Sequence, residues 1–371
     1  MKVALVHDHL TQYGGAERVL EALQAIWPEA PTYTLRYDPQ TMGQTFAHKD
    51  IRTSFLERLP FARRAFRWFL PLMPLATESY DLTDFDVVIS NSSAFSKGVI
   101  TAPHALHICY CHTPTRYLWS DSESYVDELR APKIVKAVLP LLLHKLRSWD
   151  QLAAQRVDHF VANSHTVKNR IDKYYRRPSQ VIYPPVDTDK FTISNDPKTY
   201  YLTGGRLVAY KRFDLVVDAF TKLGKPLKIF GSGPELAELK RRAGKNIEFV
   251  GRVSDDERAR LFAGAVAFIN PQEEDFGITP VESMAAGRPV IAYRRGGALE
   301  TVIDGVTGIL FDEQSWEELA DLVLRFDESK FNPVAIKAHA EQFATSVFRK
   351  QIYGLVNKLW REHEQSTLGN P

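Results

Sequence analysis

The chain has 371 residues, of which 44% are apolar and 25% charged, so it is long enough for two ordinary globular domains. A net charge of +2 is too small for a protein that binds nucleic acid through its charge, and we expect no nucleic-acid partner. The spacing of its two cysteines predicts neither a disulfide framework nor a zinc site. A strand is predicted from Val3, so we expect no signal peptide, and no apolar run is long enough to span a bilayer. We therefore expect a reduced, cytoplasmic protein.

Short apolar runs alternate with helical patterns along the whole chain, which is typical of parallel sheets covered by helices. Buried strands are predicted at residues 3–6, 87–90, 107–111, 160–163, 227–230, 247–250, 266–270, 290–293 and 308–311. Apolar residues at helical spacing lie between them, as in Val19, Leu20, Leu23 and Ile26, or Phe213, Val216, Val217 and Phe220.

The predicted domain boundary is the proline pair Pro184-Pro185, because paired prolines resist both helices and central strands. We expect a Rossmann-like domain at residues 1–182, a stiff linker at 183–188 and a second Rossmann-like domain at 189–345. The segment 346–371 is expected to form a helix that packs back across the first domain. Its apolar face would carry Phe348, Ile352, Leu355, Val356 and Leu359.

Two features of the first domain follow predicted strands. Gly14-Gly15 opens a helix after the first strand, which is where ligands gather on sheets of this kind, although a plain flexible turn is the alternative. His112 ends the strand at 107–111, and it could either face the ligand or have a structural role.

A third feature, residues 58–76, mixes arginines with large apolar side chains. This pattern suits an interfacial membrane helix, a surface helix with a buried apolar face, or a wall of an acceptor site. The sequence leaves these three interpretations open.

In the second domain, Arg206 and Lys211 lie in a glycine-containing turn between a strand and a helix. Together they could neutralise a diphosphate, although the turn lacks the ending of a Walker loop. Gly231 belongs to a Gly-x-Gly turn, which without a third glycine is weak evidence for nucleotide binding. Arg252 belongs to a loop whose main chain could contact a nucleotide base. The alternatives are a solvated basic turn at a helix start for the first segment, a plain strand-to-helix turn for the second and a loop with a serine helix cap for the third.

Glu274 and Glu282 are eight positions apart, separated by a turn and the start of a helix. We expect Pro280 to be the first residue of this helix, where its missing N–H costs nothing. Free N–H groups at the helix start would attract a phosphate, and the two carboxylates would accept hydrogen bonds from sugar hydroxyls. Considered alone, the pair could also be the general acid and base of a glycoside hydrolase.

These segments together resemble glycosyltransferase family 4, a large family of retaining enzymes with a two-domain GT-B fold. The resemblance covers nearly the entire chain and depends on the order and spacing of its motifs. Besides the residues above, it includes Gly231-Ser232-Gly233-Pro234 and the segments 283–292 and 296–300.

The resemblance implies a role for each matched residue. Arg206 and Lys211 would hold the donor diphosphate, Glu282 the ribose hydroxyls and Glu274 the hydroxyls of the donor sugar. The remaining contacts would come from His112 near the reacting sugar, from the Gly14-Gly15 loop and Gly231 near the diphosphate, from Arg252, and from the main chain of Phe276, Gly277 and Ile278.

The chemistry agrees with this assignment, because cleavage of a sugar–phosphate bond separates an oxocarbenium-like cation from a nucleoside diphosphate, which fixed cations stabilise. We expect no metal or other cofactor. Asp84-Phe85-Asp86 matches the Asp-x-Asp pattern of a metal site, but it leads into a predicted strand and is interpreted as the boundary of that strand. The family resemblance implies same-face attack by the acceptor, with Glu274 as a covalent nucleophile the alternative.

Within the family, residues 110–119 resemble the mannosyltransferase branch that builds O-antigen and other surface polysaccharides. The resemblance implies GDP-mannose as donor and a saccharide or lipid-linked saccharide as acceptor. If residues 58–76 contact a membrane, the enzyme would lie at its inner face. UDP-glucose and UDP-N-acetylglucosamine stay open as donors. A non-catalytic sugar-nucleotide-binding module is an alternative of another class, and an NAD-dependent oxidoreductase is disfavoured because a full Gly-x-Gly-x-x-Gly is missing.

Overall fold

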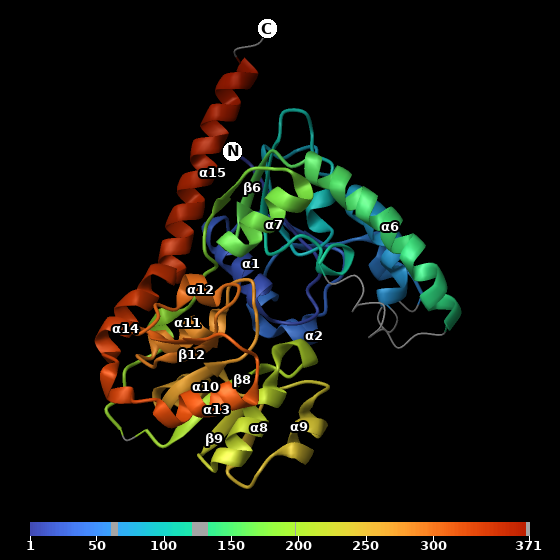
Figure 1. Ribbon diagram of the computed structural model, residues 1–371. Coiled ribbons are helices and arrows are strands. Elements are labelled where there is room, and N and C mark those ends of the chain that lie inside the picture. The colour runs from blue at the N-terminus through green and yellow to red at the C-terminus, as the bar shows by residue number, and fades with distance from the viewer. Residues whose placement is uncertain (61–65, 121–132, 197, 369–371) are drawn as a thin grey trace. The chain divides into compact units, whose positions relative to one another are not determined.

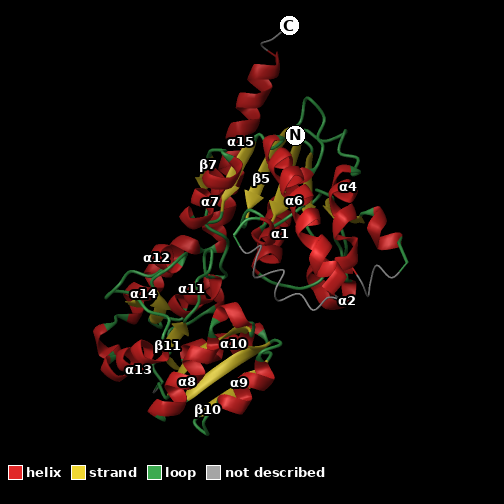
Figure 2. Ribbon diagram, turned by 45° about the vertical axis from the view of Figure 1, so that its right-hand side comes forward, coloured by secondary structure: helices red, strands yellow, loops and turns green. Residues whose placement is uncertain are grey.

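The computed structural model describes residues 1–60, 66–120, 133–196 and 198–368 (Figure 1). The chain forms two compact units, each of which is described by itself. The first unit comprises Met1–Tyr183 and Phe348–Pro371, and the second comprises Pro184–Val347. Figure 2 shows strands enclosed by helices in both units.

The first unit contains a parallel sheet with the strand order β3-β2-β1-β4-β5-β6-β7. Its strands are β1 (Val3–His7), β2 (Thr32–Thr34), β3 (Ile51–Thr53), β4 (Val87–Ser92), β5 (Leu106–Cys111), β6 (His159–Ala162) and β7 (Ser179–Val181). The four strands predicted from apolar runs are present. Strands β2, β3 and β7 escaped prediction because three residues are too few to establish a periodic pattern.

Helices cover both faces of this sheet. Successive side chains of a strand point to opposite faces, so alternate residues pack into different apolar clusters. Ile108 and Tyr110 pack toward α1 (Gly15–Ile26) and α15 (Thr345–Leu368), whereas Cys109 and Cys111 pack toward α7 (His165–Tyr175) on the other face. The remaining helices of this unit are α2 (Pro39–Met42), α4 (Met73–Glu78) and α6 (Lys133–Gln155).

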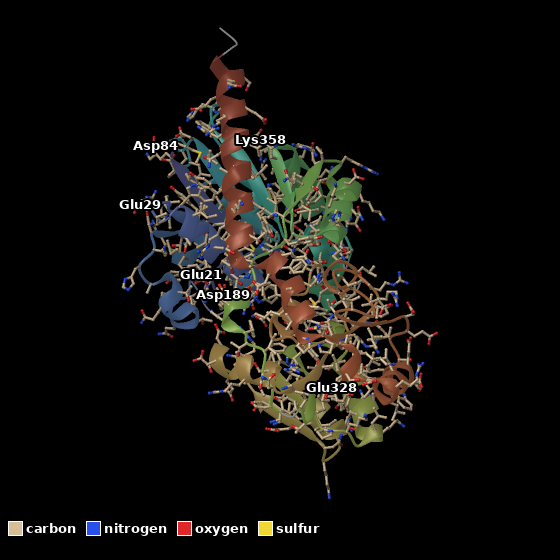
Figure 3. All side chains as sticks on the ribbon, turned by 90° about the vertical axis from the view of Figure 1, so that its left-hand side faces the viewer. Glu21, Glu29, Asp84, Asp189, Glu328 and Lys358 are labelled. Atoms are coloured by element: carbon tan, nitrogen blue, oxygen red, sulfur yellow. The ribbon has the colours of Figure 1, made fainter. Side chains whose placement is uncertain are left out.

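Helix α15 packs its apolar face on the first unit. Phe348, Ile352, Val356 and Leu359 belong to the same cluster as residues of α1 and β1. Lys358 lies on the opposite, exposed side of the helix (Figure 3). The C-terminal segment therefore completes the core of the unit that contains the N-terminus.

The second unit contains a parallel sheet with the order β10-β9-β8-β11-β12-β13. Its strands are β8 (Tyr200–Arg206), β9 (Leu227–Ser232), β10 (Ile247–Gly251), β11 (Ala265–Asn270), β12 (Val290–Tyr293) and β13 (Gly308–Phe311). Its helices are α8 (Phe213–Leu223), α9 (Leu236–Arg242), α10 (Asp255–Ala263), α11 (Ile278–Ala285), α12 (Ala298–Thr301), α13 (Trp316–Arg325) and α14 (Pro333–Ala340).

Both strand orders reverse once, between β1 and β4 in the first sheet and between β8 and β11 in the second. In open parallel sheets, ligands bind beside the carboxyl ends of the strands at such a reversal. A functional site is therefore expected among the residues that follow β1, β4, β8 and β11.

The segment expected as a linker packs into the second unit. Pro184, Pro185 and Val186 are buried. The Val186 N–H donates to the Phe343 carbonyl at 3.0 Å, and the Thr345 N–H donates to the Val186 carbonyl at 3.0 Å. The segments through which the chain enters and leaves the second unit are thus hydrogen-bonded side by side.

Two sequence-based boundaries are wrong. Helix α11 begins at Ile278, so Pro280 is its third residue; the first turn still has no use for its N–H. Gly204 and Gly205 lie inside β8 and not after it, because the strand continues to Arg206.

Residues 58–76 do not form a single helix. Two short 3-10 segments (Phe55–Arg58 and Phe66–Leu72) precede α4, and residues 61–65 lie outside the described part of the chain. Phe69 and Leu70 pack on a core cluster that includes Met73. In contrast, Trp68 is 66% exposed and Leu75 is 57% exposed. The segment thus contributes both to the core and to the surface.

A buried ion pair links β4 to α6 through the 3-10 turn Ser96–Gly98. Lys97 Nζ lies 2.5 Å from Asp150 Oδ1, and both side chains are 1% exposed. Asp150 also accepts hydrogen bonds from Thr115, Trp119 and Tyr175, each at 2.8 Å. Every oxygen of this buried carboxylate therefore has partners, which is the condition for keeping a charge out of water.

His107 makes the stability of this unit depend on pH. Its side chain is fully buried, its Nε2 lies 2.9 Å from Ser90 Oγ, and burial lowers its pKa from 6.5 to about 4. Between these values the unfolded chain binds the proton and the folded chain does not, so stability falls as the pH falls through this window. We expect His107→Gln to reduce the slope by up to about 1.4 kcal/mol per pH unit.

Urea unfolding at pH 7, 6 and 5 measures this slope. His48→Gln is the matched control, because His48 is exposed in the same unit. An unchanged slope in His107→Gln would contradict the expectation.

Candidate active site

The centre of the site in the second unit is an ion pair. Arg206 ends β8, and Lys211 ends the 3-10 turn Ala209–Lys211 that follows it. Lys211 Nζ lies 2.6 Å from Glu274 Oε1, with side-chain exposures of 13% and 19%. Burial acts to lower the pKa of Lys211, but the Glu274 carboxylate more than offsets this and raises it. Lys211 is therefore a fixed cation at neutral pH.

Two glycines hold the loop that carries Glu274. The Gly297 N–H donates to the Glu274 carbonyl at 2.8 Å. A Cβ on Gly296 would lie 2.3 Å from the same carbonyl oxygen, and one on Gly297 would lie 2.2 Å from the Phe276 oxygen. The Gly296-Gly297 pair contributed to the family resemblance without a role; its role here is to let two loops touch.

Helix α11 starts directly after this loop. Gly277 caps it with a φ of 90°, a conformation that favours glycine. Phe276 is buried against Phe343 with ring centroids 5.5 Å apart, so the main chain and not the ring of Phe276 is available to a ligand. The N–H groups of Ile278 and Thr279 have no carbonyl partner inside the helix, as in every first turn.

Glu282 lies on the second turn of α11 and is 3% exposed. Its Oε1 lies 3.3 Å from Nη2 of Arg258 on α10, whose guanidinium also contacts Asp255. The sequence contained no signal for Arg258, because its position opposite Glu282 depends on how α10 and α11 pack.

Gly231 has a packing role that needs no ligand. A Cβ on Gly231 would lie 1.8 Å from the Gly205 oxygen, and one on Gly233 would lie 2.1 Å from the Leu207 oxygen. These glycines let the ends of β8 and β9 approach each other. Arg252, after β10, donates from Nε to Ser232 Oγ at 2.7 Å, so it is placed at the same edge of the sheet.

In the first unit, a chain of side chains connects Gly14 to His112. The Gly14 N–H donates to Glu17 Oε2 at 2.8 Å, and Glu17 Oε1 lies 3.3 Å from His7 Nε2. Asn91 then bridges the two histidines, with Nδ2 3.1 Å from His7 Nδ1 and Oδ1 2.5 Å from His112 Nε2. Gly15 is the first residue of α1.

This chain determines the state of His112. Burial lowers the pKa of His112 to about 4, so the imidazole is neutral at pH 7. Since the Asn91 carbonyl oxygen only accepts, Nε2 of His112 carries the proton and Nδ1 has the lone pair. His112 is thus a neutral hydrogen-bonding group and not a general acid.

Asp8, after β1, supports the same edge of the sheet. Its two carboxylate oxygens accept four backbone N–H bonds of 2.7–2.9 Å from Ser93, Ala94, Phe95 and Ser96. Burial acts to raise the pKa of Asp8, but the neighbouring His7 and His9 and these N–H groups lower it. The sequence did not reveal this role.

Comparison with known proteins follows the same division of the chain. The model of glycosyltransferase family 4 matches residues 13–190, and the model of glycosyl transferases group 1 matches residues 187–343. The chain belongs to glycosyltransferase family 4.

Named relatives agree with the family. The alpha-1,3/1,6-mannosyltransferase ALG2 of Dictyostelium discoideum is 24% identical over 84% of this chain and 86% of its own length. A GDP-mannose-dependent alpha-(1-6)-phosphatidylinositol monomannoside mannosyltransferase of Mycobacterium tuberculosis is 33% identical over 45% of this chain, which spans about half (51%) of that relative. This family 4 member is thus an enzyme of the hexosyltransferase class.

The fold is that of solved GT-B glycosyltransferases, as predicted. Anabaena Alr3699/HepE, solved in complex with UDP and glucose, superposes with a TM-score of 0.73 at 19% identity, over 96% of this chain and 99% of that chain. At this identity the likeness supports the fold alone.

The residues predicted for the site lie toward the carboxyl ends of the strands, but only some of them lie at the strand reversals. Gly14 and Gly15 follow β1, and Arg206, Lys211, Glu274, Phe276, Gly277, Ile278 and Glu282 end or follow β8 and β11, whereas His112 follows β5, Gly231 lies in β9 and Arg252 follows β10. In the described residues, no three His, Cys, Asp or Glu side chains cluster as metal ligands would. None of the described helices is long and apolar enough to cross a bilayer.

Proposed function

We propose that this family 4 enzyme is a retaining, metal-independent glycosyltransferase that moves a hexose from a nucleotide-sugar donor to a saccharide acceptor in surface-polysaccharide synthesis. The observation that carries the proposal is the Lys211–Glu274 pair at 2.6 Å, next to Arg206 and the start of α11. It combines fixed positive charge for a departing diphosphate with a carboxylate for sugar hydroxyls.

The same arrangement supports donor binding over glycoside hydrolysis. A general acid must have a proton free to donate to the leaving group, whereas Glu274 Oε1 already contacts the Lys211 ammonium at 2.6 Å. We therefore assign Glu274 to the donor-sugar hydroxyls and the charge stabilisation to Arg206 and Lys211. Same-face attack by the acceptor then retains the anomeric configuration, and the departing phosphate accepts the acceptor's proton.

For the donor we propose GDP-mannose. Two of the named relatives are mannosyltransferases, and one of them is GDP-mannose-dependent. UDP-glucose and UDP-N-acetylglucosamine, which the sequence leaves open, are the second candidates. Transfer assays with GDP-mannose, UDP-glucose and UDP-N-acetylglucosamine, with and without EDTA, test the donor and the metal independence, and the anomeric proton signal of the product tests retention. Absence of transfer from every donor would leave a binding module.

Glu282 is proposed to accept hydrogen bonds from the ribose hydroxyls. We expect Glu282→Ala to raise the dissociation constant of the nucleoside diphosphate by about 10- to 100-fold, since a hydrogen bond to a charged group contributes about 1.5–3 kcal/mol. Calorimetric titration with GDP and UDP measures it. Glu248→Ala is the control, because Glu248 is a largely exposed carboxylate of the same unit. Equal affinities in Glu282→Ala and the native enzyme would contradict the role.

For the acceptor we propose a polyprenol-linked saccharide, with the enzyme held at the inner face of the membrane by residues 66–76. Trp68, Leu72 and Leu75 are exposed there. We expect Trp68→Ser with Leu75→Ser to reduce binding to vesicles several-fold in a flotation assay, while transfer to a soluble acceptor is unchanged. Val334→Ser, an exposed apolar residue of the second unit, is the control.

A further inference from the structure

A cationic groove lies on the first unit, between α6 and α7. It has a volume of about 430 Å³ and is formed by Trp119, by the middle of α6 and by the end of α7. Its basic and aromatic lining consists of Trp119, His144, Arg147, Lys173, Tyr174 and Arg176. No described residue with a carboxylate lines it.

Its permanent cations have no acidic partner among the described residues. Arg147, Lys173 and Arg176 form no ion pair with a described carboxylate, whereas Arg156 on α6 pairs with Glu78. Three like charges around one groove repel each other. A bound polyanion would remove that repulsion.

Two of these cations are held in place before any ligand arrives. The Arg147 guanidinium lies 5.9 Å from the centre of the Trp119 ring, and its Nε donates to the Leu118 carbonyl at 2.6 Å. Lys173 Nζ lies 5.7 Å from the centre of the Tyr174 ring. Side chains restrained in this way lose less entropy when they bind an anion.

The aromatic pair is in turn anchored in the core. The rings of Trp119 and Tyr174 stack with centroids 5.0 Å apart and planes 23° apart. Trp119 Nε1 donates to the buried Asp150 at 2.8 Å. The groove is thus built on the same network that holds the Lys97–Asp150 ion pair.

Arg176 adds an independent observation. It caps α7 with φ 55° and ψ 38°, a left-handed conformation that costs a residue with a side chain about 1 kcal/mol and glycine almost nothing. An arginine nevertheless occupies this position, and it lines the groove. The strained cap places a third guanidinium at the groove.

We propose that this groove binds a diphosphate group carried by the acceptor. Three permanent cations match the two to three negative charges of a diphosphate, and an arginine fork suits phosphate oxygens. The inference rests on the proposed function, because it assigns this group to the polyprenol-linked acceptor. The chemistry recognised is that of a phosphate anion, so free pyrophosphate is the second source to test.

The first experiment measures the anion site without transfer. Inorganic pyrophosphate is titrated calorimetrically into the Arg206→Ala/Lys211→Ala protein, which lacks the basic pair of the second unit. We expect this protein to bind pyrophosphate. The further substitutions Arg147→Gln and Lys173→Gln should weaken the affinity at least tenfold, whereas Lys168→Gln, at an exposed lysine of α7, should leave it unchanged. No binding by the Arg206→Ala/Lys211→Ala protein, or equal affinity after Arg147→Gln and Lys173→Gln, would overturn the site.

Arg176→Gly separates binding from folding. Glycine relieves the strained cap, so we expect an equal or higher melting temperature together with weaker pyrophosphate binding. The substitution is made in the Arg206→Ala/Lys211→Ala protein. If its pyrophosphate affinity equals that of the protein that keeps Arg176, Arg176 does not belong to the site.

The second experiment distinguishes the two sources of the diphosphate. In the otherwise native enzyme, Arg147→Gln/Lys173→Gln should raise KM at least tenfold for a diphosphate-linked saccharide, with kcat and the KM of the same saccharide as a neutral methyl glycoside unchanged. Equal KM values would show a site for free pyrophosphate and overturn the acceptor assignment. Transfer to neither acceptor would contradict the proposed function, while the titration would still decide the site.

Discussion

Lys211→Ala is expected to lower kcat by about 100- to 1,000-fold, which is the usual effect of removing one fixed donor from a developing negative charge. Lys211 is a cation held in a mostly buried position by Glu274, so it needs no reorganisation when the diphosphate departs. Its loss therefore acts on the transition state more than on donor binding. Initial rates at saturating donor, with KM measured in parallel, separate the two effects.

Two further variants make this expectation specific. Lys190→Ala is the control, because Lys190 forms an exposed ion-pair cluster with Asp187 and Asp255 in the same unit and should leave kcat unchanged. Arg206→Ala should lower kcat in the same way as Lys211→Ala. Normal transfer by the Arg206→Ala/Lys211→Ala double variant would refute the proposed mechanism.

Lys97→Met is expected to lower the free energy of unfolding by about 3–5 kcal/mol, since it leaves the buried Asp150 carboxylate without its cation. The remaining donors to Asp150 are neutral groups, namely Thr115, Trp119 and Tyr175. They satisfy its lone pairs but cannot balance its charge. Chemical unfolding followed by near-ultraviolet circular dichroism measures the loss.

The double variant Lys97→Met/Asp150→Asn tests the cause. If the uncompensated charge is responsible, neutralising Asp150 should recover part of the loss, so the two substitutions should not be additive. Lys145→Met, an exposed lysine on α6, is the control. Additive losses would indicate that packing and not charge is responsible.

The site illustrates how far sequence reasoning reaches. Glu274 and Glu282 were recognisable as a pair, and the basic turn with Arg206 and Lys211 was predicted as a candidate diphosphate site. Their partners were not. Arg258 lies on a helix whose sequence shows only a serine cap and a polar surface, and Asn91 lies in a strand that looked merely buried. Both act across elements, where local patterns carry no information.

The sequence by itself determined the fold class and the family. A parallel strand buried on both faces appears as an apolar run, a covering helix appears as a 3.6-residue period, and the motifs follow each other in the family's order. It also placed the glutamate pair at a strand-to-helix turn, although it misplaced the start of that helix.

Only the tertiary structure decided which charges meet. Lys211 reaches Glu274 because β8 and β11 are neighbours at the strand reversal, and Asp8 reaches residues 93–96 because β1 lies beside β4. The buried Lys97–Asp150 pair and the groove around Arg147 depend in the same way on how α6 packs. Strand order and helix packing arise from burial summed over the whole chain, so no short segment can reveal them.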